Sequence, residues 1–268
     1  MGPRNPSLIA GAALVATIAV MALLGPALVR TDPLAIDLAL VLAPPEHGHW
    51  LGCDALGRDI LARVLWGARL SLGVSATVVF VSLALGSLVG GAAALVGGRV
   101  DALVMRTVDI VLAFPGFLFA LALAAILGPG LVKLVIALSA MGWTGYARLV
   151  RGEVLSLRER DYVEAARALG APPARLLVRH LLPALAGPVA VQATFGVGGV
   201  IVAEASLSFL GLGARPPTPT WGNMLEAGRA FLLVAPHLTA APGVAIGAAV
   251  LGFNLFGDGI AQAVGVRG

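Results

Sequence analysis

Long apolar segments separated by polar ones most constrain how this 268-residue chain can fold. A helix needs about 20 mainly apolar residues to cross the hydrocarbon core of a bilayer. Six segments approach that length, at residues 8–29, 70–96, 111–127, 131–147, 181–203 and 238–256. Only 12% of the residues are charged, whereas soluble domains carry about 25%. We therefore predict an all-α, polytopic membrane helix bundle of about six transmembrane helices.

Polar segments divide this predicted bundle into parts. The first apolar segment lacks a convincing small-residue cleavage site, so we interpret it as a retained helix rather than a signal peptide. Segments rich in charge, Pro or Gly should lie outside the bilayer. The predicted parts are an N-terminal transmembrane helix within 1–30, an external loop at 31–69, and a core at 70–260 that contains a charged segment at 148–183 and an external loop at 206–237.

Basic residues are distributed unevenly between the two sides of such a bundle. With six crossings, the two termini share a side with residues 97–110 and 148–180, and these segments hold eleven of the eighteen Lys and Arg residues. Cytoplasmic loops of membrane proteins carry the excess of Lys and Arg. We therefore expect a multi-pass protein with both termini in the cytoplasm.

A short polar helix is predicted inside the charged segment. Asp161, followed three residues later by Glu164, is similar to a capping box at a helix start. Gly170 suits the left-handed position that follows a helix end. Pro172 and Pro173 suit the first turn of a next helix, and Pro183 should break the chain again before the fifth crossing.

This predicted helix has a face of small side chains at Ala165 and Ala166. Small side chains let a helix approach a partner closely, and two isolated helical turns are marginally stable in water. Docking in a groove of another protein would stabilise them. An ordinary helix in an interfacial loop is the alternative interpretation.

The same segment resembles the cytoplasmic signature of the inner-membrane permeases of bacterial binding-protein-dependent ABC importers. Glu164-Ala165-Ala166, Gly170 and Leu182-Pro183 stand at the spacings of that signature. His180 occupies a position where the signature has Ile. The run from Arg179 to Pro183 is similar to the version found in the dipeptide, oligopeptide and nickel branch of the family.

Further motifs similar to that branch extend over about residues 45–260, in an arrangement most like the second permease of a pair. Cys53 departs from the pattern, because Thr is usual at its position. The matching motifs are Leu51-Gly52-Cys53-Asp54, Gly57-Arg58-Asp59, Ala113-Phe114-Pro115, Tyr146-Ala147-Arg148, the run from Glu204 to Gly211, and Trp221-Gly222-Asn223-Met224.

The resemblance implies a second homologous permease, two separate ATPase subunits that bind ATP and Mg, an external substrate-binding protein and surrounding membrane lipid. We expect no nucleic-acid partner, no cofactor and no enzyme activity in this chain. Its only lysine, Lys133, follows Val132, whereas the Walker A lysine follows Gly. The residues that the resemblance assigns to ATPase coupling are Asp161, Glu164, Ala165, Ala166, Gly170 and Pro183.

Polar residues on the predicted outer side are candidates for the pathway or for external contacts. Glu204 ends the fifth apolar segment, where it either lines the pathway or is paired or solvated at the interface. Arg58 and Asp59 either form local structure, for instance by pairing with each other, or contact the binding protein. Trp221 could anchor the second external loop at the membrane surface, and Asn223 lies beside it.

The same sequence bears on other sites and functions. His47 and His49 have no further ligand nearby, so we expect no metal site, and a single cysteine forms no internal disulfide. Gly86 and Gly90 have the spacing of a helix-packing motif. Di- or oligopeptides are the expected substrates, with nickel chelates, glutathione or another small solute as alternatives. A stand-alone secondary transporter or channel is the alternative from a different functional class. The residues give no support for a membrane enzyme.

Overall fold

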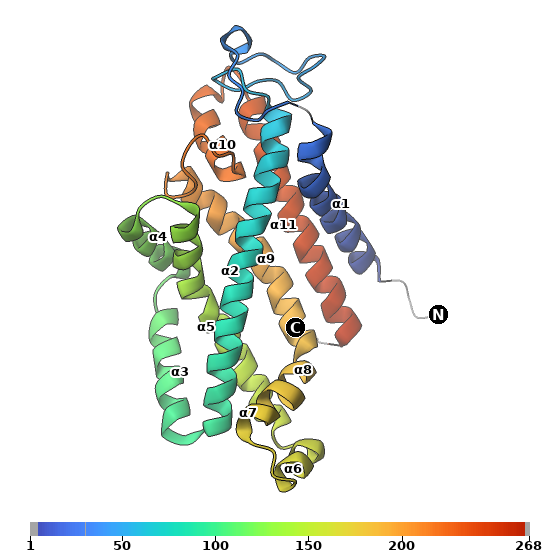
Figure 1. Ribbon diagram of the computed structural model, residues 1–268, viewed down its shortest axis with the longest axis vertical. Helices are drawn as coiled ribbons and strands as arrows, with labels where there is room; N and C mark the ends of the chain where they lie inside the picture. Colours follow the sequence, from blue (N-terminus) through green and yellow to red (C-terminus); the bar gives the residue numbers. More distant parts are fainter. Residues whose placement is uncertain (1–4, 30, 266–268) are drawn as a thin grey trace.

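The computed structural model describes residues 5–29 and 31–265, and every regular element within them is helical (Figure 1). The all-α prediction is therefore confirmed. The α-helices are α1 (Pro6–Leu28), α2 (Ile60–Val96), α3 (Gly98–Leu112), α4 (Gly116–Leu127), α5 (Leu131–Leu157), α6 (Asp161–Ala168), α7 (Pro173–Leu176), α8 (Leu182–Ala184), α9 (Ala186–Phe209), α10 (Trp221–Gly228) and α11 (His237–Val264). Short 3-10 turns cover Leu38–Leu40 and Arg229–Phe231, and a π-helical turn covers Leu177–Leu181.

The helices form an elongated bundle with α2 at its centre. α2 packs along α5 on one side and against α1 and α9 on the other, and α11 completes the bundle between α1 and α9 (Figure 1). The segment 31–59 and α10 lie at the upper end of Figure 1, and α6 and α7 lie at the lower end. These two ends are called the upper and lower ends below.

Four helices are long and apolar enough to cross a membrane: α1, α2, α9 and α11. α3 and α4 pass the same criterion only together, and they are bent by 84°. Counting that pair as one span gives five in the described part of the chain. The fourth predicted crossing, 131–147, corresponds to α5, which has 27 residues but carries Arg148, Arg151 and Glu153 in its lower half.

The third predicted crossing, 111–127, is wrong as a single helix. α3 ends at Leu112, and α4 begins at Gly116 after Pro115. Proline lacks the amide hydrogen that a helix needs and disfavours a helical conformation in the residue before it. The apolar run therefore straddles a bend between two helices.

The predicted outer loop, 31–69, is also too long, because α2 begins ten residues earlier than expected. Asp59 is the N-cap of α2, and its Oδ1 accepts a hydrogen bond of 2.7 Å from the Ala62 amide. An Asp side chain in this position satisfies an amide that has no partner within the helix. The loop therefore ends at Asp59, and Arg63 and Arg69 lie on the helix.

The close packing predicted for Gly86 and Gly90 is confirmed at the contact of α2 with α5. A Cβ atom at Gly90 would lie 2.2 Å from the carbonyl oxygen of Ala147, and one at Gly86 would lie 2.5 Å from that of Trp143. Only glycine leaves room for two helix backbones at this distance. The two glycines thus allow close contact of α2 and α5 over about one helical turn.

Candidate coupling segment and outer polar sites

α6 is the lowest helix of the molecule (Figure 1) and starts one residue earlier than a capping box would require. The N-cap is Arg160, which makes no side-chain capping bond, and Asp161 is the first helical residue. The predicted capping box of Asp161 and Glu164 is therefore wrong. Both carboxylates still lie in the first turn, where they interact favourably with the positive end of the helix dipole.

The end of α6 has the geometry expected from Gly170. Its φ is +81°, a left-handed conformation in which a side chain would be strained. The Gly170 amide donates to the Arg167 carbonyl at 2.9 Å, and the Ala171 amide donates to the Ala166 carbonyl at 3.1 Å. This pair of bonds is a Schellman motif, which stops the helix and turns the chain back.

One side of α6 is anchored in an apolar cluster, and the other side is open. Val163 is fully buried and packs with residues from the lower ends of α2 and α5 and from the chain after α6. Around the rest of the helix, Tyr162 is 45% exposed and Leu169 is 89% exposed. This group, called the inner cluster, comprises Ala94, Val150, Val154, Val163, Leu176, Leu177, Leu181 and Leu185.

The predicted coupling residues do not share one face of α6. Asp161, Glu164, Ala165 and Gly170 are exposed, whereas Ala166 is half-buried against the inner cluster. Consecutive helical residues point about 100° apart, so the two alanines cannot both face outward. Ala165 contributes to the open side, and Ala166 helps to attach the helix to the bundle.

The chain after α6 follows the prediction at Pro173 but not at Pro183. α7 has Pro173 at its first position. Pro183 does not break the chain, because a π-helical turn precedes it, in which the Leu182 amide donates to the Leu177 carbonyl. The wider turn accommodates a residue without an amide hydrogen. Helical structure resumes in α9 after a single turn residue, Leu185.

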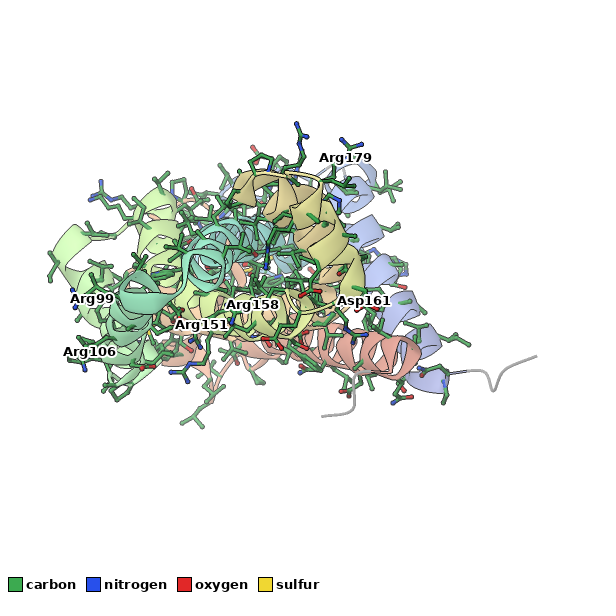
Figure 2. All side chains as sticks on the ribbon, turned by 90° about the horizontal axis from the view of Figure 1, so that it is seen from below. Arg99, Arg106, Arg151, Arg158, Asp161 and Arg179 are labelled. Carbon is green, nitrogen blue, oxygen red and sulfur yellow. The ribbon has the colours of Figure 1, made fainter. Side chains whose placement is uncertain are left out.

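Arginines gather at the lower end, as Figure 2 shows for Arg99, Arg106, Arg151, Arg158 and Arg179. Two of the ion pairs there join α3 to α5. Arg151 donates two hydrogen bonds to the carboxylate of Asp101, at 2.5 and 2.6 Å, and Arg148 lies 2.6 Å from Asp109. The paired fork of Arg151 fixes the bent helix pair against the bundle.

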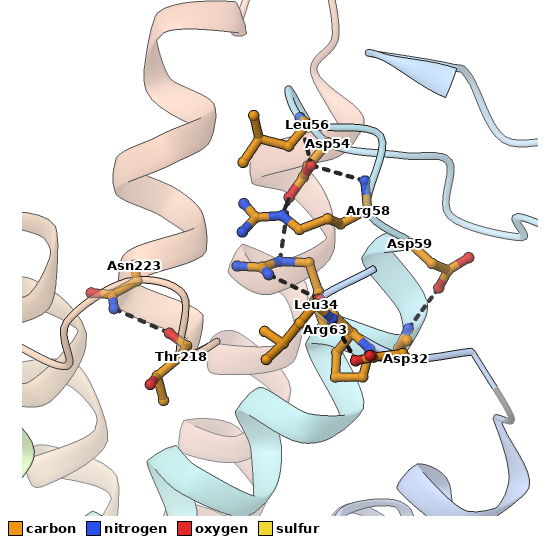
Figure 3. A network of polar contacts seen from close by, with 11 residues as sticks. Asp32, Leu34, Asp54, Leu56, Arg58, Asp59, Arg63, Thr218 and Asn223 are labelled. Atoms are coloured by element: carbon orange, nitrogen blue, oxygen red, sulfur yellow. Dashed lines mark hydrogen bonds and ion pairs between the residues drawn. The ribbon is translucent and has the colours of Figure 1, made fainter. Parts of the chain in front are cut away.

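At the upper end, Arg58 and Asp59 do not pair with each other; each has another partner (Figure 3). Arg58 Nε donates to Asp54 Oδ2 at 2.7 Å. Asp59 Oδ2 lies 2.8 Å from His49 Nδ1 while Oδ1 caps α2. Both side chains thus take part in local structure, through Asp54 and His49 rather than by pairing with each other.

Glu204 lies inside the bundle rather than at the membrane interface. It precedes the end of α9 by five residues and is fully buried. Its Oε2 accepts a hydrogen bond of 3.1 Å from Ser71 of α2, and its Oε1 accepts one of 2.8 Å from Ser208. The expected position at the interface is wrong for this structure, in which Glu204 is buried and ties α9 to α2.

Trp221 is also inside, so its predicted position at the membrane surface is wrong. Its side chain is 1% exposed, and its Nε1 donates to the Val64 carbonyl at 3.0 Å. The Trp221 amide donates to Ser71 Oγ at 3.4 Å, so one serine contacts both Glu204 and α10. Asn223 is half-buried, and its Nδ2 donates to the Ala214 carbonyl at 2.6 Å.

Several residues of these sites escaped the sequence analysis. Ser71 and Ser208 look like ordinary small residues of apolar segments, although Ser208 stands four residues after Glu204 and so shares its helix face. Arg63 falls within the predicted loop 31–69. Asp54 was noted only as part of a motif, yet it contacts both Arg58 and Arg63. Among the residues described, no cluster of three or more His, Cys, Asp or Glu side chains could hold a metal ion.

Comparison with known proteins gives the family. Residues 61–267 match the family described as the inner membrane component of binding-protein-dependent transport systems. The chain belongs to this family. This permease is 46% identical over 220 residues to the glutathione transport system permease protein GsiD of Escherichia coli O6:K15:H31 (strain 536 / UPEC). The aligned region covers 82% of this chain and 73% of the relative. GsiD of Shigella boydii serotype 4 (strain Sb227) matches with the same identity and coverage.

The family membership confirms several predictions together. The permease is a multi-pass component of the inner membrane and a transport protein rather than an enzyme. Its dependence on a binding protein implies a substrate-binding protein and an ATPase as partners. The predicted branch of dipeptide, oligopeptide and nickel permeases is consistent with the relatives.

Proposed function

We propose that this permease forms half of the translocation pathway of an ATP-driven importer and that α6 couples it to a separate ATPase subunit. The observation that carries the proposal is the two-sided environment of α6. Val163 is fully buried in the inner cluster, while Leu169 is 89% exposed at the lower tip of the molecule. A helix that is anchored on one side and presents Tyr162 and Leu169 among charged side chains on its open side is suited to a groove in a partner.

The inner cluster supplies a path for coupling. It joins α6 through Val163 to Ala94 of α2 and to Val150 and Val154 of α5. Packed side chains transmit displacements because close-packed interiors compress little. ATP-driven movement of the ATPase would therefore shift α6 and the lower ends of α2 and α5 together, and the permease would alternate between two packings of similar free energy.

The orientation belongs to the same proposal. The arginine-rich lower end (Figure 2) would lie in the cytoplasm with both termini, and the upper end would face the external binding protein. A second homologous permease would complete the pathway, lipid would surround the pair, and ATP and Mg would bind to two ATPase subunits. The exposed apolar side chains of α1 and α11, such as Leu23 and Val244, suit lipid or permease contacts.

The relatives guide the choice of substrate. They are named as glutathione transport permeases, and glutathione is a small acidic peptide. We propose that this permease carries short peptides, with glutathione as the first one to test. Nickel chelates and other small solutes are the alternatives within the importer class.

Substitutions on the open side of α6 test the coupling role. Leu169→Asp should remove an apolar contact with the ATPase without disturbing the bundle, because Leu169 is 89% exposed. We expect uptake to fall at least tenfold and the ATPase to be lost on purification of the permease. Leu38→Asp is the matched control, since Leu38 is 72% exposed at the opposite end, and it should keep both properties.

A bulky charged residue at Gly170 is the second variant. Gly170→Asp places a side chain at a φ of +81° and should weaken both uptake and co-purification. The coupling proposal is wrong if both variants of α6 retain the ATPase and full uptake. Uptake by the purified permease without any ATPase would instead favour a stand-alone transporter.

A further inference from the structure

A cleft of about 290 Å³ opens at the upper end of the molecule, beside the start of α2. Arg58 and Arg63 form one wall, and Thr218 and Asn223 belong to the opposite wall (Figure 3). Arg215 and Glu226 also line it. The cleft is thus a polar site with three guanidinium groups, outside the coupling segment. Ser208, which also lines it, donates a hydrogen bond to the buried Glu204.

Two of these guanidinium groups are nearly enclosed and share one carboxylate. The side chains of Arg58 and Arg63 are 12% and 6% exposed. Asp54 Oδ2 lies 2.7 Å from Arg58 Nε and 3.4 Å from Arg63 Nε, and Arg63 Nη1 donates to the Pro33 carbonyl at 3.1 Å. Two positive charges next to one negative charge leave an excess of one in a site with little water. Burying an unpaired positive charge costs free energy unless a negative charge lies close enough to neutralise it.

The rest of the lining does not supply that counter-charge. Arg215 is exposed on the rim and adds a third cation. Glu226 is the acid among the lining residues, and it lies 3.8 Å from Arg229, which sits outside the lining. Asn223 uses its amide nitrogen to hold the loop through Ala214. The cleft therefore has a net positive lining, and an anion would complete it.

We infer that this cleft binds a carboxylate of the peptide substrate at the outer mouth of the permease. The inference rests on the proposed function and adds a site to it. Arginine matches a carboxylate with two parallel N–H donors. The volume stands at the lower limit of small-molecule pockets, about 300–1,000 Å³, so it suits a short peptide. A peptide released by the binding protein would be attracted by the positive lining before it moves inward.

Protection of an engineered cysteine tests the site in the complete importer, in right-side-out membrane vesicles. Ala227→Cys places an exposed thiol in the lining of the cleft, and the native Cys53 is buried. The probe is S-methylglutathione, which keeps both carboxylates of glutathione and has no thiol. We expect it to slow maleimide labelling of Ala227→Cys at least threefold at millimolar concentration, and its dimethyl ester to have no effect.

Charge variants of the lining give the matched comparison. Arg215→Gln, made together with Ala227→Cys, should abolish the protection. Arg69→Gln should leave it intact, because Arg69 is an exposed arginine of α2 outside the cleft. A cysteine at Ala39, exposed at the same end but outside the cleft, should label equally fast with and without probe.

Three outcomes would overturn the inference. These are equal protection by the dimethyl ester, equal protection in Arg215→Gln, and the absence of protection by S-methylglutathione. Protection by the ligand-free binding protein alone would show that the cleft is a protein contact, and the inference would then also be wrong. Uptake of labelled glutathione by the unmodified importer is measured alongside. Protection without uptake would refute the proposed glutathione substrate and leave the carboxylate site supported.

Discussion

Single side chains in this permease take their roles from neighbours that are distant in sequence. Glu204 and Trp221 look like interfacial residues in the sequence, since each stands where an apolar segment gives way to a polar one. Ser71, 133 residues before Glu204, contacts both of them. No local pattern reports such a partner, so sequence reasoning placed both side chains on the surface.

Replacing Glu204 should destabilise the bundle more than its polarity suggests. Glu204→Ala leaves the hydroxyl groups of Ser71 and Ser208 without their acceptor, and each unsatisfied buried group costs about 1–3 kcal/mol. We expect Glu204→Ala to lower the midpoint of thermal unfolding of the purified complex clearly. Glu204→Gln should lower it less, because the glutamine side chain keeps one acceptor. Glu46→Ala, at an exposed acid of the upper end, should not change the midpoint.

The single cysteine should be almost inert in the folded protein. Cys53 is fully buried, and this burial, helped by Asp59 and Asp54, raises the pKa of its thiol from 9.0 to about 11. Because the thiolate is the reactive form, a rise of two units lowers reactivity about 100-fold at any pH below 9. Reactivity should therefore increase with pH up to about 11.

Maleimide labelling of membranes at pH 7.5 checks this. Little incorporation is expected before denaturation and one label per chain after it. Labelling of the native permease at the rate of the unfolded chain would contradict the burial of Cys53.

At the scale of elements, sequence reasoning succeeded where helices are apolar and failed where they extend beyond the apolar run. α1 lies within two residues of its predicted segment, because hydrophobic length decides it, whereas α11 continues eight residues beyond its predicted end. α2 begins ten residues early, since the bilayer does not limit a helix whose first turns carry Arg63 and Arg69. Pro115 was visible in the sequence, but the 84° bend after α3 depends on how α3 packs against α5.

The contact of α2 with α5 gives a prediction at this scale. In Gly90→Ala the new methyl group would meet the Ala147 backbone, 2.2 Å from its carbonyl oxygen, so the helices must separate at a cost of about 1–3 kcal/mol. Gly73→Ala is the control on the same helix, because a Cβ atom there meets nothing within 4 Å. It should keep or slightly raise stability, as alanine favours helix over glycine.

Thermal unfolding of the purified Gly90→Ala and Gly73→Ala variants tests this prediction. The expected order of midpoints is Gly90→Ala below the unmodified permease and Gly73→Ala at or above it. Equal midpoints for the two variants would mean that α2 and α5 are not held as closely as described.

The whole molecule has two chemically different ends. The lower end is rich in arginine (Figure 2), and the upper end sets Arg58 and Arg63 beside the single carboxylate of Asp54 (Figure 3). The asymmetry was readable from the sequence because it depends only on counting charges between apolar segments. The arrangement of α10 over α2 and α9 was not readable, because it depends on tertiary contacts such as that of Trp221 with Val64.

Labelling from one side of the membrane checks the orientation of the molecule. A membrane-impermeant maleimide should label Ala39→Cys in intact cells and should reach Leu169→Cys only after the membrane is permeabilised. Both positions are exposed, so burial does not confuse the comparison. The reverse pattern would place α6 outside the cell and remove the basis for ATPase coupling.

The length of α2 has a mechanical consequence for the importer. Its 37 residues make a rod of about 55 Å at about 1.5 Å per residue. Ala94, near the lower tip of the rod, belongs to the inner cluster with Val163, and Arg63, near the upper tip, lines the outer cleft. Used as a lever, a rod of that length tilted by about 5° at one tip sweeps its other tip through about 5 Å. A small tilt of α6 driven by an ATPase subunit would thus move the upper tip of α2 far enough to release a bound carboxylate.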